Sequence, residues 1–262
     1  MEAIAVYLAA GIVAGLLGGL FGLGGGAIVV PVLIYSFSLS GFEKSVLTHM
    51  AIGTSLATIV VTSLSAVYVH HRNAAVLWRI TGWMAPGIGL GVIGGGLLAT
   101  ALSGAILQAL FGAFLIAVAI QMAFGGNPKP HRDLPGPVAG TSSAAGIGFV
   151  SGIFGIGGGS LSVPYLTYCN VDIAKAIGTS AALGFPIAVL GALTYMVRGW
   201  GMSDLPASAL GYVFLPAFLG ITLTSIPAAR LGALLAHRLP AIFLKRLFAL
   251  VAFLLGVGFV IP

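Results

Sequence analysis

Gly18-Gly19-Leu20-Phe21-Gly22-Leu23-Gly24-Gly25-Gly26 interrupts an apolar stretch that runs from Ala3 to Phe42 without a charged residue. A related stretch occurs in the second half of the chain, Ser151-Gly152-Ile153-Phe154-Gly155-Ile156-Gly157-Gly158-Gly159. Pro31 and Pro164 stand at matching places after the two stretches. Each glycine costs about 1 kcal/mol relative to alanine inside a helix, and proline removes a backbone donor. We therefore expect a helix to open at both places, in two related halves of one chain.

The composition indicates that these breaks lie in a membrane. Of 262 residues, 59% are hydrophobic and 6% are charged, against about 25% charged in soluble domains. Long charge-free runs exceed the roughly 20 apolar residues that a membrane span needs. The expected order is a broken segment over 3–38 with spans at 46–69, 77–101 and 104–124, then a broken segment over 138–168 with spans at 173–197, 206–230 and 240–261.

This order predicts an all-α polytopic membrane protein made of two repeats, each a broken or re-entrant helical hairpin followed by three transmembrane helices. The first repeat takes residues 1–125, a Pro-rich polar linker takes 126–137, and the second repeat takes 138–262. Gly53-Thr54-Ser55 and Gly178-Thr179-Ser180 recur after the two breaks. The single cysteine, Cys169, excludes a disulfide within the chain and a cluster of thiolate metal ligands.

The basic residues predict the orientation of the halves. If every half made four full crossings, the eleven Lys and Arg would divide five against six between the two sides of the membrane. If each broken segment returns to its starting side, or makes two short crossings, the division is nine against two, with only Lys44 and Arg198 on the minority face. The positive-inside rule favours this second arrangement. The charge count requires this return only of the broken segment in the second half. We extend it to the first half because the two halves are related by the repeat. The halves are then inverted, both termini are periplasmic and the linker is cytoplasmic.

The duplicated break with its downstream proline and Gly-Thr-Ser resembles the sulfite exporter TauE/SafE family over nearly the whole chain. The resemblance implies a transporter, not an enzyme, that moves sulfite or short organosulfonates such as sulfoacetate out through the bacterial inner membrane. It implies a small anion and the lipid bilayer as partners, no cofactor and no nucleic acid. Whether the protein forms a homo-oligomer stays open.

The breaks themselves favour an anion as the ligand. A helix opened in hydrocarbon is tolerated only where its free backbone groups line a cavity or are buried in protein. The start of the helix that follows each break presents N–H donors and the positive end of a dipole. The alternative is that the glycines only allow close helix packing, which Gly11, Gly15 and Gly19 are expected to do on one face of the first segment. The predicted substrate-binding residues at the breaks are Gly24, Gly25, Gly26, Gly157, Gly158 and Gly159.

Polar side chains within the following spans are further candidates. The hydroxyls of Thr54, Ser55, Thr179 and Ser180 could bind an anion, or equally a carbonyl of their own or a neighbouring helix. His49 is the one titratable side chain inside a charge-free run rather than at its edge. Such a residue is a functional candidate by default, and the alternative is that neutral His49 caps a helix end.

Other classes of protein fit less well. Gly22-Leu23-Gly24-Gly25-Gly26-Ala27 matches a dinucleotide-binding pattern, but that pattern needs a strand, turn and helix in a soluble domain. Ser55 and His49 invite a serine hydrolase reading, yet the second Gly-Thr-Ser has no such histidine. A cation carrier is disfavoured because no Asp or Glu lies within a span. The remaining alternative is an importer of a related oxyanion such as thiosulfate or sulfate.

Overall fold

The computed structural model describes residues 2–21, 25–124, 136–235 and 241–260. Ten helices occur in these ranges: α1 Glu2–Phe21, α2 Gly26–Leu39, α3 Lys44–Arg72, α4 Trp78–Ala101, α5 Gly104–Phe124, α6 Pro137–Phe154, α7 Gly159–Tyr168, α8 Ile173–Arg198, α9 Leu215–Leu235 and α10 Ala241–Val260. One short antiparallel pair, β1 Ala209–Leu210 and β2 Val213–Phe214, lies between α8 and α9. Most of the predicted linker lies outside the described residues.

Five of the described helices are long and apolar enough to cross a membrane: α3, α4, α8, α9 and residues Gly104–Gln121 of α5. Three shorter apolar helices belong to the broken segments, Ile4–Leu20, Gly26–Leu39 and Val138–Phe154. The chain is therefore an all-α polytopic membrane protein, as its composition predicts.

One predicted boundary is wrong. The span expected at 206–230 begins only at Leu215, because the residues before it form turns and the β1–β2 pair. Gly211 has a φ of 55°, and the Tyr212 amide donates to the carbonyl of Tyr195 at 3.3 Å. An uncharged run can thus be a folded loop when its backbone donors find partners on neighbouring helices.

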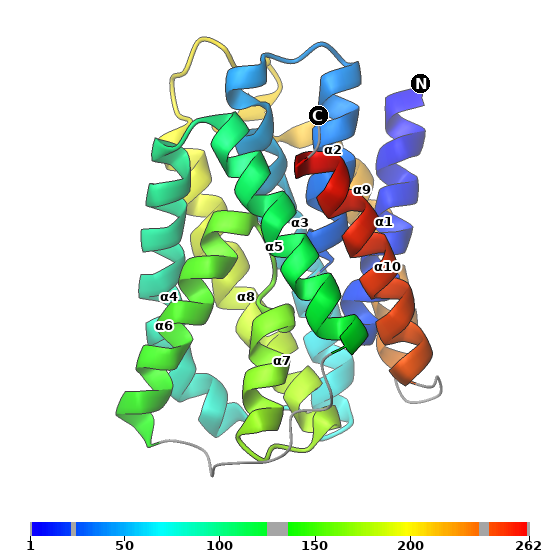
Figure 1. Ribbon diagram of the computed structural model, residues 1–262, viewed down its shortest axis with the longest axis vertical. Coiled ribbons are helices and arrows are strands. Elements are labelled where there is room, and N and C mark those ends of the chain that lie inside the picture. Colours follow the sequence, from blue (N-terminus) through cyan, green and yellow to red (C-terminus); the bar gives the residue numbers. More distant parts are fainter. Residues whose placement is uncertain (1, 22–24, 125–135, 236–240, 261–262) are drawn as a thin grey trace.

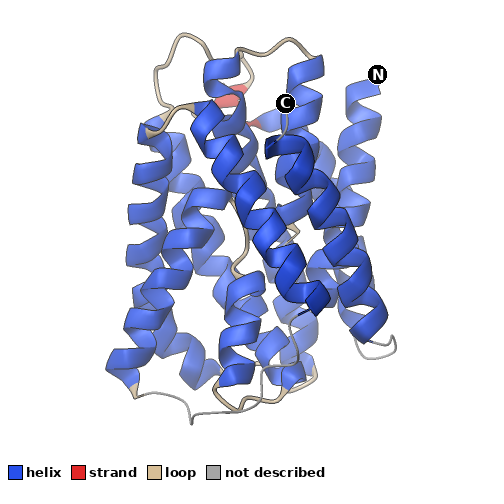
Figure 2. Cartoon of the chain, in the orientation of Figure 1, coloured by secondary structure: helices blue, strands red, loops and turns tan. Residues whose placement is uncertain are grey.

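Both glycine stretches break a helix. Gly25 and Gly158 precede α2 and α7 with φ values of 76° and 75°, and Gly155 ends α6 with a φ of 67°. These left-handed conformations cost little only for glycine. Residues 22–24 lie outside the described ranges. The connection between α6 and α7 lies in the middle of the bundle rather than at one of its ends (Figure 2).

The halves pack against each other reciprocally. α1 lies along α9 and α6 lies along α4, while α3 meets α8 and α5 meets α10 (Figure 1). α1 begins and α10 ends at the top of Figure 1, whereas α5 ends and α6 begins at the bottom. An inverted repeat would give this arrangement, and the inverted repeat itself stays a prediction.

Small residues bring the crossing helices together. A Cβ atom on Gly87, Gly91 or Gly95 of α4 would overlap a backbone carbonyl of α6. Gly11, Gly15 and Gly19 of α1 face the backbone of α9 in the same way, which confirms the packing role predicted for them. Close backbone approach of this kind is how helices gain contact in a membrane, where apolar burial against lipid gives no driving force.

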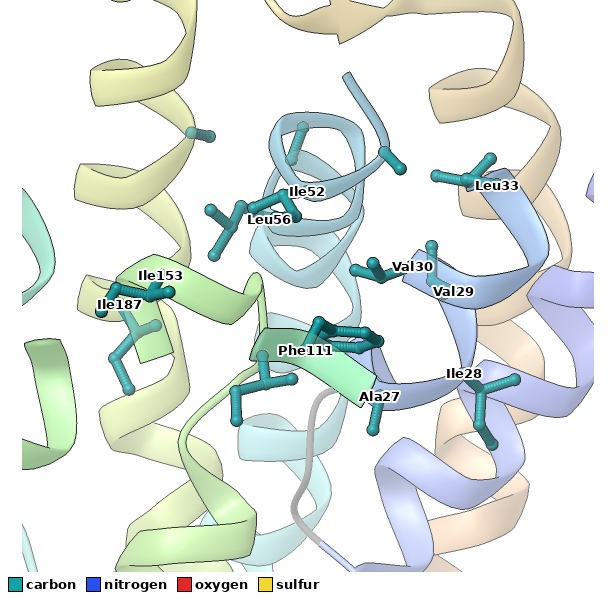
Figure 3. Close-up of a cluster of buried hydrophobic side chains, with 14 of the residues drawn as sticks. Ala27, Ile28, Val29, Val30, Leu33, Ile52, Leu56, Phe111, Ile153 and Ile187 are labelled. Atoms are coloured by element: carbon teal, nitrogen blue, oxygen red, sulfur yellow. The ribbon is translucent and has the colours of Figure 1, made fainter. Parts of the chain in front are cut away.

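The core surrounds the two breaks. Ile28, Val30 and Leu33 from α2 lie near Ile52 and Leu56 of α3, and Ile153 and Ile187 come from the second half (Figure 3). All of these side chains are buried. The polar backbone at the breaks is therefore enclosed by apolar side chains.

Candidate functional site

The two helix breaks touch one another. A Cβ atom on Gly26 would collide with the carbonyl oxygen of Gly155 and lie 3.0 Å from the Cα of Ile156. Gly155 in turn lies against Ile52 of α3. The structure thus brings Gly25, Gly26 and the Gly157–Gly159 stretch to one region between the halves, while Gly24 lies outside the described residues.

Each helix that follows a break begins with a turn of backbone amides that point away from the body of the helix. In α2 the amides of Ile28 and Val29 donate to the carbonyl of Gly25 at 3.0 and 3.1 Å. In α7 the amides of Leu161 and Ser162 donate to the carbonyl of Gly158 at 3.0 and 2.7 Å. The amides that precede these in the chain have no partner within their own helix. Neither helix has a side-chain cap or an acidic residue in its first turn, so the positive end of each dipole is not neutralised there.

Ser55 and Ser180 are both fully buried, but their hydroxyls differ. Ser55 Oγ donates to the carbonyl oxygen of Gly155 at 2.9 Å, which ties α3 to the break in the other half. Ser180 Oγ has no hydrogen-bond partner among the described residues. Anion binding by Ser55 and Ser180 stays a prediction, and for Ser55 it would require release of the Gly155 carbonyl.

Thr54 and Thr179 bind backbone of the opposite half. Thr54 Oγ1 accepts from the amide of Phe214 at 2.9 Å, and Thr179 Oγ1 accepts from the amide of Leu77 at 3.0 Å. Gly53 and Gly178 lie against carbonyls of the same two loops. Each Gly-Thr-Ser thus joins a central helix to the loop before α9 or α4. This joining role is not evident in the sequence, and anion binding by the two threonines stays a prediction.

His49 lies against the end of α4. Its Nε2 is 3.2 Å from the carbonyl oxygen of Ala99 and 3.1 Å from that of Leu102, and its ring stacks on Tyr212 at a centroid distance of 5.2 Å. An Nε2–H group placed there donates to two carbonyls that end a helix. This contact matches the capping alternative, and a role in charging or coupling the ligand stays a prediction.

A small cavity lies beside the second break. It is lined by Gly18, Thr62, Ser63, Ala66, Gly157, Ala181 and Gly184, so both halves contribute. The hydroxyls of Thr62 and Ser63 donate to carbonyls of their own helix. Within the described ranges, no group of three or more His, Cys, Asp or Glu side chains is placed to hold a metal ion.

Two buried serines near the second break, Ser151 and Ser162, escaped sequence reasoning. Both are fully buried, and no described residue forms a hydrogen bond with either hydroxyl. The signal that could have found them is the difference between the repeats, because Gly18 and Val29 stand at the matching places.

Comparison with known proteins adds a family and several relatives. The family described as "Sulfite exporter TauE/SafE" matches residues 7–259. A probable membrane transporter protein of Haemophilus influenzae is 38% identical over 94% of both chains. A probable membrane transporter protein of Methanocaldococcus jannaschii is 31% identical over 83% of this chain and 78% of its own. No solved structure matches the chain.

Proposed function

Because the chain belongs to the sulfite exporter TauE/SafE family, we propose that it exports small sulfur-containing anions, such as sulfite or sulfoacetate, across the bacterial inner membrane. Its relatives are named probable membrane transporters, which supports a transporter of some kind. The anion would bind between the two breaks. The observation that carries this proposal is the contact of Gly26 with Gly155, which brings the first residue of α2 against the break that precedes α7.

A site made of dipoles and hydroxyls suits an exporter. An unpaired buried Arg or Lys would be costly in the empty protein and would hold an anion firmly. Backbone amides and hydroxyls carry only partial charge, so a ligand can enter and leave. The membrane potential is an adequate driving force, because an exiting monoanion gains about 2.3 kcal/mol per 100 mV when the inside is negative.

The geometry does not favour a serine hydrolase. The hydroxyl of Ser55 donates to the carbonyl of Gly155, and the Nε2 of His49 contacts the carbonyls of Ala99 and Leu102. A nucleophilic serine needs a base within hydrogen-bond reach. Neither group is directed at the other in the structure.

Flux measurements test the function. Purified protein in proteoliposomes should release sulfite or sulfoacetate faster than protein-free vesicles do, and an inside-negative potential should accelerate the release. Sulfate and thiosulfate in the same panel examine the alternative of an importer for a related oxyanion. Movement of none of the four anions, in either direction, would contradict the proposal.

The orientation of the chain is a separate part of the proposal. Lys44 begins α3 and Arg198 ends α8, both at the top of Figure 1. Arg72, Arg79 and Lys175 lie near helix ends at the bottom, as do Arg230 and Arg246. By the positive-inside rule the bottom face is cytoplasmic and both termini are periplasmic.

Cysteine labelling from outside intact cells measures this orientation. His131→Cys should stay unlabelled, because the linker would face the cytoplasm, while Ser203→Cys in the exposed loop before α9 should react. The native Cys169 is buried, and the parent protein gives its background. The reverse labelling pattern would show the opposite orientation.

A further inference from the structure

The second break carries serines that the first break lacks. Ser151 lies in the last turn of α6, and Ser160 and Ser162 lie in the first turn of α7. The matching positions in the first half are Gly18, Ala27 and Val29, none of which has a side-chain donor. The two breaks share a backbone conformation at Gly25 and Gly158 but differ in chemistry.

Ser151 and Ser162 are buried without partners. Their side chains are 0% exposed, and neither hydroxyl oxygen has a hydrogen-bond partner among the described residues. Ser65 and Ser142 of the same bundle do donate to carbonyls, those of Ile226 and Ala139. Leaving a buried hydroxyl unpaired is unfavourable, so two in one place call for a ligand that pairs them.

Both hydroxyls face the start of α7. A Cβ atom built on Gly158 would lie 3.4 Å from Ser162 Oγ and 3.5 Å from Ser151 Oγ. The two oxygens therefore lie beside the same position, next to Gly158. The amides that begin α7, a helix of ten residues, follow Gly158 directly in the chain. The end of the Ile187 side chain, from α8, occupies this position and would have to rotate away for a ligand to enter.

We propose that Ser151 and Ser162, together with the first amides of α7, bind the oxyanion group of the transported substrate in the second half alone. This inference rests on the proposed function and refines its site. A sulfite or sulfonate group has three oxygens. The two hydroxyls and an amide at the helix start can together donate one hydrogen bond to each of them. The dipole of α7 favours an anion over a cation at this place. The ligand then lies off the axis that relates the halves.

Serine-to-alanine variants separate ligand binding from structure. Because no residue in the described part of the chain bonds either hydroxyl, Ser151→Ala and Ser162→Ala should keep or raise the melting temperature of the ligand-free protein. The apparent affinity for sulfite, measured from the rise in melting temperature on adding sulfite, should fall about 10-fold in each single variant and about 100-fold in the double variant. The reason is the loss of hydrogen bonds to a charged group. Flux at low sulfite should fall in the same order.

Two matched variants serve as controls. Ser142→Ala removes an exposed hydroxyl of α6 that donates to its own helix and should change neither melting temperature nor sulfite affinity. Ser55→Ala removes the donor to Gly155 and should lower the melting temperature without ligand. Ser151 and Ser162 differ from both controls in losing ligand affinity without losing stability.

The outcomes distinguish the two proposals. If wild-type protein responds to sulfite and the Ser151 and Ser162 variants respond equally well, this subsite is wrong and the transport function stands. If the variants keep their sulfite affinity but lose a dependence on Na⁺, the serines hold a cation and the subsite is again wrong. If wild-type protein neither binds nor moves any of the four anions, the proposed function fails and the subsite fails with it.

Discussion

Gly25→Val is expected to abolish anion efflux while the protein still inserts in the membrane. Gly25 has a φ of 76°, a conformation that β-branched residues avoid. A Cβ atom there would also lie 2.6 Å from the carbonyl oxygen of Ala14 in α1. Valine would therefore displace the start of α2, which packs against the second break through Gly26 and Gly155. Flux from proteoliposomes, with the amount of inserted protein determined by immunoblot, measures the effect.

Gly41→Val is the control for backbone strain. Gly41 has nearly the same φ, 73°, but nothing lies within 4 Å of a Cβ built on it. It carries the strain of a left-handed residue, about 1–2 kcal/mol, without the collision. Efflux should remain close to wild type in this variant. Equal efflux from Gly25→Val and wild type would show that the α2 start plays no part in transport.

Gly91→Val is expected to destabilise the folded protein itself, and not only to block transport. A Cβ at Gly91 would overlap the carbonyl of Ala145 and lie 2.7 Å from the amide nitrogen of Phe149. Both atoms belong to the backbone of α6, so no side-chain rotation relieves the contact. The helices would have to separate along their crossing, at a cost of about 3 kcal/mol or more. Thermal unfolding in detergent, followed by size-exclusion chromatography, should show aggregation or a large drop in melting temperature.

Gly94→Val on the same helix tests whether the effect comes from the crossing. Its Cβ would lie 3.7 Å from the ring of Phe149, an ordinary contact, and the change in helix propensity is the same. This variant should melt close to wild type. A Gly91→Val protein as stable as Gly94→Val would mean that α4 and α6 do not pack as closely as the structure has them.

Much of the fold is predictable from local chemistry. The two glycine-rich stretches followed by proline open helices, and apolar runs of sufficient length become spans, so the breaks and most helix bounds follow from the sequence. A glycine triplet alone does not suffice, because Gly94–Gly96 lies within the continuous helix α4. The start of α9 does not, because Tyr212 and Phe214 donate to Tyr195 and Thr54. These contacts join residues far apart in the chain, and hydropathy carries no information about them.

The candidate site was less predictable for the same reason. The sequence shows that Thr54 and Thr179 recur, but not that each accepts an amide from the other half. It shows that His49 stands in an apolar run, but not that the end of α4 lies beside it. The residues shared by the two halves do not point to Ser151 and Ser162, because Gly18 and Val29 stand at the matching positions of the first half.

The packing of α1 against α9 and of α6 against α4 has a consequence for synthesis on the ribosome. Chains emerge from the N-terminus, and early segments generally fold before later ones exist. α4 can meet α6 once residues up to Phe154 have been made, but α1 must wait for α9, which ends at Leu235. Gly11, Gly15 and Gly19 therefore face lipid or a temporary neighbour during most of translation, since the backbone they fit is among the last parts of the chain to enter the membrane.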